Sequence, residues 1–289
     1  MSWYAVVPAG AFCLRVVLVP LLCVLRQAGV LPRVVSIGGN ECYSPKGVRH
    51  GASVSSGSSE QVMGEVMAHS GSSGLVVPAR TVPFPQGYKS LMSAQEKVVF
   101  ARDVALEVED LGYDVVASSV TGSRLRGTDH EDSDSDFLLL VSDKTKAFSF
   151  DRGEYEGQVQ SLGSYLDKVS TSVPYMEYLM SPFGVTDRRF APVIDAVRPN
   201  ITEFRYHADK FAMHLCARPA MKPEKRARNV LSTYLFRETV NPLMPRSVYE
   251  MTHPMKSDAA DWLEEIHSIR GIDMNDETRD TVRILRSNG

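Results

Sequence analysis

The stretch that decides the fold reads Gly122-Ser123-Arg124-Leu125-Arg126-Gly127-Thr128-Asp129-His130-Glu131-Asp132-Ser133-Asp134-Ser135-Asp136-Phe137. It continues into the apolar run Leu138-Leu139-Leu140-Val141, which is typical of a buried strand. On a strand, residues two apart project to the same side, so we expect Asp134 and Asp136 to point together. The stretch therefore predicts two neighbouring carboxylates at the start of a buried strand.

These residue types predict a particular chemistry. Two adjacent carboxylates are costly to leave ionised and unpaired, and a hard divalent cation with oxygen ligands, most naturally magnesium, relieves that cost. Gly122 permits a sharp turn, and the backbone amides there, together with the Ser123 hydroxyl, predict a cradle for phosphate. The pattern thus indicates a site for a nucleoside triphosphate and its magnesium.

The residues around this stretch predict a helix and two strands. Ser93-Ala94-Gln95-Glu96 has the pattern of a capping box, and the helix that follows carries apolar residues at helical spacing until Gly112. Residues 113–120 are rich in strand formers, residues 124–133 are a short connection, and residues 134–141 form the second strand. Order is therefore expected to begin at Ser93.

The rest of the chain becomes helical. Residues 154–160 favour a third strand, residues 161–169 a helix, and residues 175–180 are apolar and ambiguous. Helical spacing then recurs in four segments, residues 202–217, 223–240, 257–269 and 276–286. We predict an α+β fold in which a small, palm-like mixed sheet over residues 93–185 precedes a helical domain over residues 186–289.

Residues 1–92 contain Gly, Ser and Pro clusters without periodicity, so we expect disorder, or an extension upstream of a true start at Met92. Within them, prolines and a glycine interrupt the apolar segment from Tyr4 to Leu25. Its longest clean run, Val16 to Leu25, is about half of the roughly 20 residues that a membrane span needs. We therefore expect no membrane association.

The charge and the cysteine content indicate which partners and which cellular compartment to expect. The net charge is -3, and residues 1–90 hold seven Lys and Arg against three Asp and Glu, which leaves 25 against 32 for residues 91–289. An acidic catalytic part argues against broad binding to duplex DNA and favours small substrates. The four cysteines form no CxxC pair, so a reducing, cytoplasmic setting without zinc or disulfides is expected.

The Gly-Ser, spacer, Asp-x-Asp pattern of residues 122–136 resembles the signature of the DNA polymerase β-like nucleotidyltransferase superfamily. Its Gly-Ser-Arg-x-x-Gly opening and Asp-Ser-Asp-x-Asp close are most similar to predicted nucleotidyltransferases of bacteria and their phages. The resemblance implies an enzyme that uses two magnesium ions to transfer a nucleoside monophosphate from an NTP such as ATP. The acceptor would be a hydroxyl on a small molecule, an RNA end or a protein.

Carried onto this sequence, the resemblance implies that Gly122 and Ser123 bind the β- and γ-phosphates while Asp134 and Asp136 ligate magnesium. Arg124 is a further candidate for pairing with the triphosphate, and Arg126 is a weaker one.

A third catalytic carboxylate is expected on a later strand. The aligned position falls on Gln158, and the candidate is therefore Glu156, two residues earlier on the same strand face.

Three alternatives remain open at this stage. The chain could be an antitoxin-like or regulatory module that modifies or masks a partner protein, or a nucleotide-binding protein that has lost catalysis, as Gln158 would suggest. A calcium loop starting at Asp132 is a third alternative, but Phe137 stands where such a loop requires Gly. The segment Asp129 to Asp132 is expected to be a solvated loop.

Overall fold

A mixed β-sheet forms the centre of the computed structural model, which describes residues 74–78, 82–142, 147–151, 153 and 155–287. Six strands in the described part run in the order β1-β6-β2-β3-β5-β4. They are β1 (Leu75–Val76), β2 (Val115–Val120), β3 (Ser135–Val141), β4 (Phe148–Asp151), β5 (Tyr155–Ser161) and β6 (Gly184–Asp187). The β3 and β5 pair is parallel and the other pairs are antiparallel, which confirms a mixed sheet.

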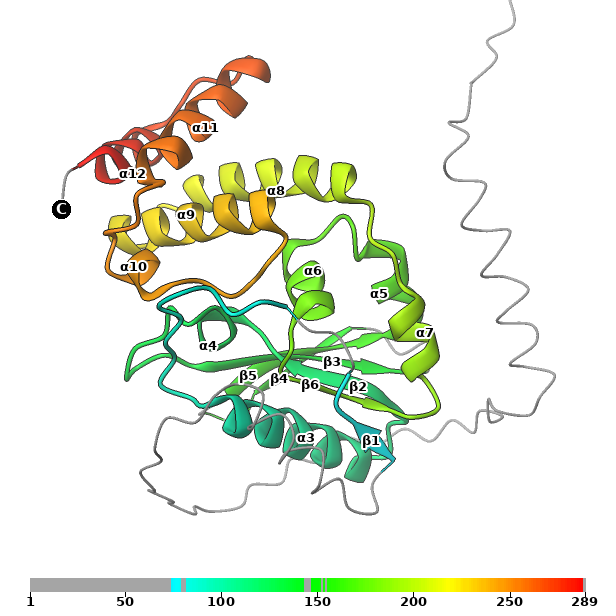
Figure 1. Ribbon diagram of the computed structural model, residues 1–289. Helices are drawn as coiled ribbons and strands as arrows, with labels where there is room; N and C mark the ends of the chain where they lie inside the picture. Colours follow the sequence, from blue (N-terminus) through cyan, green and yellow to red (C-terminus); the bar gives the residue numbers. More distant parts are fainter. Residues whose placement is uncertain (1–73, 79–81, 143–146, 152, 154, 288–289) are drawn as a thin grey trace, which may run out of the picture. The chain divides into compact units, whose positions relative to one another are not determined.

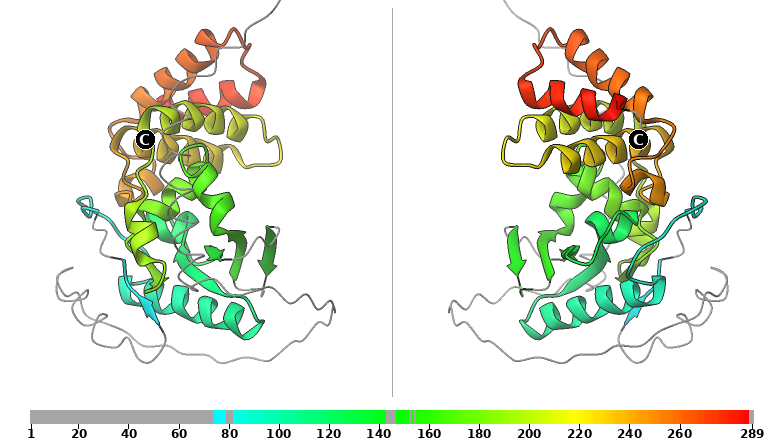
Figure 2. Two further views of the ribbon diagram at one scale, coloured as in Figure 1. Left: turned by 90° about the vertical axis from the view of Figure 1, so that its right-hand side faces the viewer. Right: turned by 90° about the vertical axis from the view of Figure 1, so that its left-hand side faces the viewer.

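Helices cover both faces of this sheet, as Figures 1 and 2 show. They are α3 (Ala94–Asp110), α4 (Gly122–Arg126), α5 (Leu162–Lys168), α6 (Val173–Met180), α7 (Ala191–Ala196), α8 (Ile201–Cys216), α9 (Pro223–Thr239), α10 (Arg246–Tyr249), α11 (Lys256–Ile269) and α12 (Asp276–Arg286). Helix α3 lies on one face, and α5 and α6 lie on the other, with α8 and α9 beyond them (Figure 1). The α+β fold with a helical C-terminal part is confirmed.

Alternation along β3 assigns its side chains to two cores. Leu138 and Leu140 pack with residues of α5, α6 and α8, whereas the odd-numbered positions from Phe137 to Val141 pack with α3. Since side chains two apart share a face, Asp136 lies on the α6 side of the sheet. The alternation therefore fixes the face on which the site forms.

Local signals placed most helix ends correctly. Ser93 caps α3, because its Oγ accepts a hydrogen bond from the Glu96 amide at 3.2 Å and the Glu96 carboxylate accepts one from the Ser93 amide at 2.7 Å. Gly112 follows the helix with φ +91°. The ambiguous segment is helix α6. The short strands β1, β4 and β6 were not predicted.

The segment before α3 belongs to the fold where the structure describes it. Strand β1 pairs with β6, and Leu75 is buried. Tyr88 donates a hydrogen bond from its hydroxyl to the Leu125 carbonyl at 2.9 Å. Disorder up to residue 92 is thus a wrong prediction for residues 74–78 and 82–92.

Residues 1–73 lie outside the described residues, and with them the apolar segment from Tyr4 to Leu25 and three of the cysteines. In the part that is described, no helix is both long and apolar enough to cross a bilayer. Cys216 is buried in the helical core.

One hydrophobic core joins the sheet to the helical part. Leu138 and Leu140 of β3 belong to the same cluster as Phe204 of α8, Phe236 of α9 and Leu263 of α11. The predicted boundary between residues 185 and 186 falls inside β6. The division into two domains stays a prediction.

Candidate active site

The motif glycine and the second motif aspartate are in contact. Gly122 opens α4 with φ +67°, and a Cβ atom placed on it would lie 2.0 Å from Oδ2 of Asp136. The Thr121 amide also donates a hydrogen bond to the Asp136 carbonyl at 2.9 Å. Only a residue without a side chain fits this backbone conformation and this distance. The fold therefore closes residues 122–136 into one site.

Glu156 is the neighbour of Asp136 on the next strand. The parallel register of β3 and β5 pairs Asp136 with Glu156 and Leu138 with Gln158. Paired residues of adjacent strands project to the same face of a sheet. Of the two positions considered from the sequence, Glu156 therefore lies beside Asp136, and Gln158 lies two pairs further along the same strands.

The electrostatics of Asp136 reflect this gathering of carboxylates. Burial raises the pKa of Asp136 from 3.8 to about 6, and the nearby charges of Asp134, Glu156 and Glu177 also raise it, while Arg126 lowers it. A partly buried carboxylate surrounded by like charges favours a bound cation or proton. The site is thus built to accept positive charge.

Asp134 lies immediately before β3, which begins one residue later than predicted, and it is exposed. Within the residues described, no group of three or more His, Cys, Asp or Glu side chains is arranged to hold a metal ion. Magnesium needs no such cage, because it commonly binds one or two carboxylates and completes its shell with waters and substrate phosphates. The oxygen donors of Asp134 and Asp136 fit an ion that binds together with a triphosphate.

Gly122 and Ser123 form the first turn of the short helix α4, so the predicted connection from Arg124 is helical up to Arg126. The Ser123 carbonyl accepts hydrogen bonds from the amides of Gly127 at 3.0 Å and Thr128 at 3.1 Å. Its hydroxyl has no hydrogen-bond partner among the residues that the structure describes. This hydroxyl and the free amides of the first turn remain available to a ligand.

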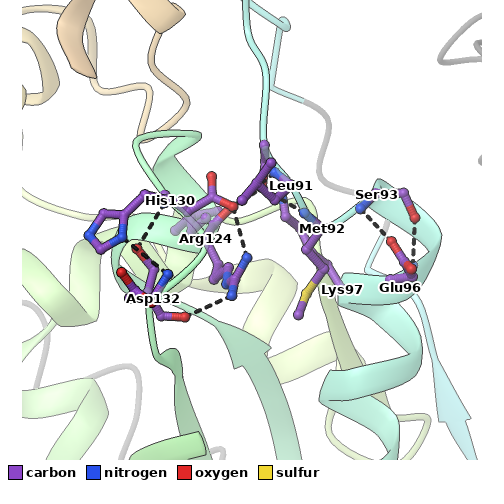
Figure 3. A network of polar contacts seen from close by, with 12 residues as sticks. Leu91, Met92, Ser93, Glu96, Lys97, Arg124, His130 and Asp132 are labelled. Atoms are coloured by element: carbon purple, nitrogen blue, oxygen red, sulfur yellow. Dashed lines mark hydrogen bonds and ion pairs between the residues drawn. The ribbon is translucent and has the colours of Figure 1, made fainter. Parts of the chain in front are cut away.

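Arg124 has structural partners. Its Nη1 donates to Asp129 Oδ2 at 3.1 Å and its Nη2 donates to the Ser133 carbonyl at 2.7 Å. Figure 3 shows it between Leu91 and the turn that carries His130. These bonds brace the connection that leads to β3. The predicted role of Arg124 in binding the triphosphate stays a prediction, and none of these contacts supports it.

Asp129 is fully buried, so the expectation of a solvated loop is wrong for this residue, although Glu131 and Asp132 are exposed. Its Oδ2 accepts hydrogen bonds from the Leu91 amide at 2.9 Å and the Ser90 hydroxyl at 3.1 Å, besides Arg124. The connection and the segment before α3 are therefore held together by one carboxylate.

Lys97 lies buried beside this network. Its Nζ donates to the Tyr88 hydroxyl at 2.5 Å and lies 4.5 Å from the centroid of the Phe183 ring. Burial lowers the pKa of Lys97 to about 7, with the Asp129 charge opposing that shift and Arg124 adding to it. In place of water, the Lys97 ammonium therefore contacts aromatic rings and one hydroxyl group.

Glu177 was not predicted as a site residue, and its partner Arg126 was only the weaker candidate for binding the triphosphate. Glu177 is a buried carboxylate on the otherwise apolar helix α6, and Arg126 Nη1 donates to its Oε1 at 2.8 Å. The Nε of Arg126 is buried and has no hydrogen-bond partner. Both charges act on Asp136. A lone charge in an apolar helix is the signal that could have revealed this pair.

In this mixed sheet the Gly-Ser start of α4 contacts the aspartate of the next strand, β3. Residues 101–190 match the family described as a nucleotidyltransferase domain, so this part of the chain is such a domain, consistent with the superfamily that the motif resembles. The matched range contains all the predicted site residues and Glu177, and a domain of this family supports nucleoside monophosphate transfer in general. No curated protein matches the chain.

Proposed function

We propose that the protein transfers a nucleoside monophosphate from an NTP to an acceptor hydroxyl in a magnesium-dependent reaction. The observation that carries the proposal is the contact of Gly122 with Asp136, together with the pairing of Asp136 and Glu156. A phosphate cradle beside several carboxylates is what in-line phosphoryl chemistry requires.

The reaction forms one bond and breaks one. The acceptor oxygen attacks the α-phosphorus, the bond from that phosphorus to the bridging oxygen of the pyrophosphate breaks, and pyrophosphate leaves with the electron pair. The hydroxyl proton passes to a carboxylate, for which Glu156 is the candidate. Bound at Asp134 and Asp136, magnesium would neutralise the charge that builds up on the phosphate oxygens.

Gly122 and Ser123 hold the β- and γ-phosphates in this proposal, through backbone amides and the free Ser123 hydroxyl. Arg126 is a better placed cation for the triphosphate than Arg124, because it acts on Asp136 and keeps donors that Glu177 does not use. Arg124 instead fixes the connection between the two halves of the motif.

The register of β3 and β5 bears on one alternative, a protein that binds nucleotide but has lost catalysis. Its sequence argument was the neutral Gln158, but Gln158 pairs with Leu138, and the acidic Glu156 stands beside Asp136. This arrangement favours a complete set of carboxylates and therefore a working enzyme.

Incubation with α-labelled NTPs, magnesium and cell extract tests the proposal. The expected result is release of pyrophosphate with one or more NTPs and label attached to an acceptor. Repeating the reaction with γ-labelled NTP is the control, because label from the γ-position should leave with the pyrophosphate. Hydrolysis to free monophosphate without any labelled acceptor would contradict nucleotidyl transfer.

A further inference from the structure

A cationic and aromatic cluster lies beside the connection that carries the motif aspartates. The guanidinium carbons of Arg246 and Arg228 lie 4.0 Å and 4.6 Å from the centroid of the Tyr249 ring, and the His130 ring lies 6.3 Å from it. We refer to His130, Arg228, Arg246 and Tyr249 as the Tyr249 cluster. It unites three segments that are far apart in the sequence.

The connection itself holds the cluster close to the site. Arg246 Nη1 donates to the Asp129 carbonyl at 3.0 Å, and His130, the next residue, lies four positions before Asp134. The Met244 amide donates to the Arg126 carbonyl at 2.8 Å, which joins the segment before α10 to the end of α4. The cluster therefore packs against the connection that joins the two halves of the motif.

Arg246 and Arg228 differ in what the fold uses them for. Arg246 binds the Asp129 carbonyl and forms an ion pair with Glu250 at 3.6 Å. Arg228 is half-buried against Tyr249, and its guanidinium makes no hydrogen bond or ion pair with any residue that the structure describes. Stacking on an aromatic ring fixes a guanidinium while leaving its N–H donors free. Arg228 is thus held in place without an anion.

His130 supplies a second donor. Its Nδ1 accepts a hydrogen bond from the Asp132 amide at 3.2 Å, which assigns the proton of the neutral ring to Nε2. The side chain is exposed, so this N–H faces outward.

Helix α9 begins with several positively charged side chains, and their charge does not stabilise the helix. Arg226 is buried and donates to the carbonyls of Met221 and Glu277, so its role is structural. Lys222 and Lys225 are exposed on the same first turn, where positive charge opposes the helix dipole. Both lysines precede Arg228 at the start of the same helix, in a part of the chain whose net charge is otherwise acidic.

We propose that the Tyr249 cluster binds a phosphate group of the acceptor, with Arg228 as its main ligand and His130 as a second donor. Because the triphosphate has its own contacts at Gly122, Ser123 and Arg126, a separate anion site serves the other substrate. The acceptor is then a phosphate-bearing molecule, either a nucleotide or the end of an RNA strand. This inference rests on the proposed function.

Binding measured without turnover tests the inference. A fluorescent single-stranded RNA is titrated with the full chain in the absence of NTP, and AMP is then added as a competitor. Arg228→Ala should weaken RNA binding about tenfold, the loss of one charge-assisted contact. The slope of log affinity against log salt should fall by about 0.7 for one lost phosphate contact. Arg228→Lys should retain part of the affinity.

Arg283→Ala is the matched control. Arg283 is an exposed arginine on α12 whose ion pair is with Asp280 at 2.8 Å, so its loss changes the net charge equally and should leave RNA binding unchanged. Competition by AMP at concentrations similar to those of RNA strands would identify a nucleotide acceptor, and RNA binding without competition would identify a strand end.

Equal RNA binding by Arg228→Ala and the wild type, or binding of neither RNA nor AMP by the wild type, would overturn the inference and point to an acceptor without phosphate, such as a protein. Failure of the proposed function has a different signature. In that case the wild type binds RNA through Arg228 and releases no pyrophosphate from any NTP.

Discussion

Replacing Gly122 by alanine tests the contact on which the site depends. The added Cβ would lie 2.0 Å from Asp136 Oδ2, whereas ordinary contacts of a Cβ atom begin at 3.4 Å. The carboxylate must therefore move by about 1 Å or more, and a misplacement of that size in an active site costs about 100-fold in rate. The left-handed backbone, with φ +67°, adds strain of about 1–2 kcal/mol.

Gly271→Ala separates the contact from the strain. Gly271 has φ +61°, and no atom lies within 4 Å of the position that a Cβ atom would occupy there, so alanine carries similar strain without a collision. Both variants should lose about 2–8 °C in Tm, as expected for 1–2 kcal/mol in a domain of this size. The circular dichroism spectrum of each variant shows whether the fold is kept.

The assay is pyrophosphate release under identical NTP and magnesium concentrations. We expect Gly122→Ala to lose about 100-fold in rate and Gly271→Ala to stay within about twofold of the wild type. A folded Gly122→Ala variant with the wild-type rate would refute the reasoning. A similar loss in both variants would also refute it, because strain alone would then explain the effect.

Three further predictions concern buried charges. Asp136→Asn should abolish transfer but stabilise the ligand-free protein at pH 7 by at most about 3 kcal/mol. The pKa of Asp136 is about 6 in the folded protein against 3.8 in the unfolded chain, so the free energy of unfolding falls as the pH rises between these values. Urea unfolding across that pH range should show the fall only in the wild type. The pKa of Lys97 is about 7 in the folded protein against 10.5 in the unfolded chain, so Lys97 makes the free energy of unfolding rise with pH above 7, by at most about 1.4 kcal/mol per pH unit. Lys97→Met should remove that rise in urea unfolding experiments. An unchanged slope of unfolding free energy against pH would contradict the burial of the amine. Glu177→Ala should destabilise the folded protein by about 3 kcal/mol, because it leaves Arg126 without its partner. Adding Arg126→Met should recover part of that loss. Strictly additive effects of the two substitutions in this double-mutant cycle would disprove the coupling between the two side chains.

The sequence predicted the parts of the site that are local in the chain. Gly122 and Asp136 are fourteen positions apart, and the strand period and the conformational freedom of glycine were enough to bring them into one motif. The choice of Glu156 also agrees with the register, because residues 154–160 were predicted as a strand and Glu156 is the residue of that strand that pairs with Asp136.

The parts that were missed depend on packing between distant segments. Glu177 lies 51 residues from Arg126, and their pairing requires α6 to pack over α4. Likewise, the segments around Leu75 and Tyr88 are too short to show a strand or helix pattern in the sequence. They are ordered because Leu75 pairs with β6 and Tyr88 accepts a hydrogen bond from Lys97. Arg124 shows the same limit, since its sequence position suggested the phosphate while its contacts are with Asp129 and Ser133.

The most direct test of the central claim compares the wild type with the double variant Asp134→Asn and Asp136→Asn in the presence of magnesium and α-labelled NTP. Both substitutions keep the size of the side chains and remove the charge that holds the metal. The account predicts labelled acceptor and pyrophosphate from the wild type, and neither from a double variant whose circular dichroism spectrum is unchanged. Transfer by the double variant at the wild-type rate would contradict the claim that these two carboxylates form a nucleotidyltransferase site.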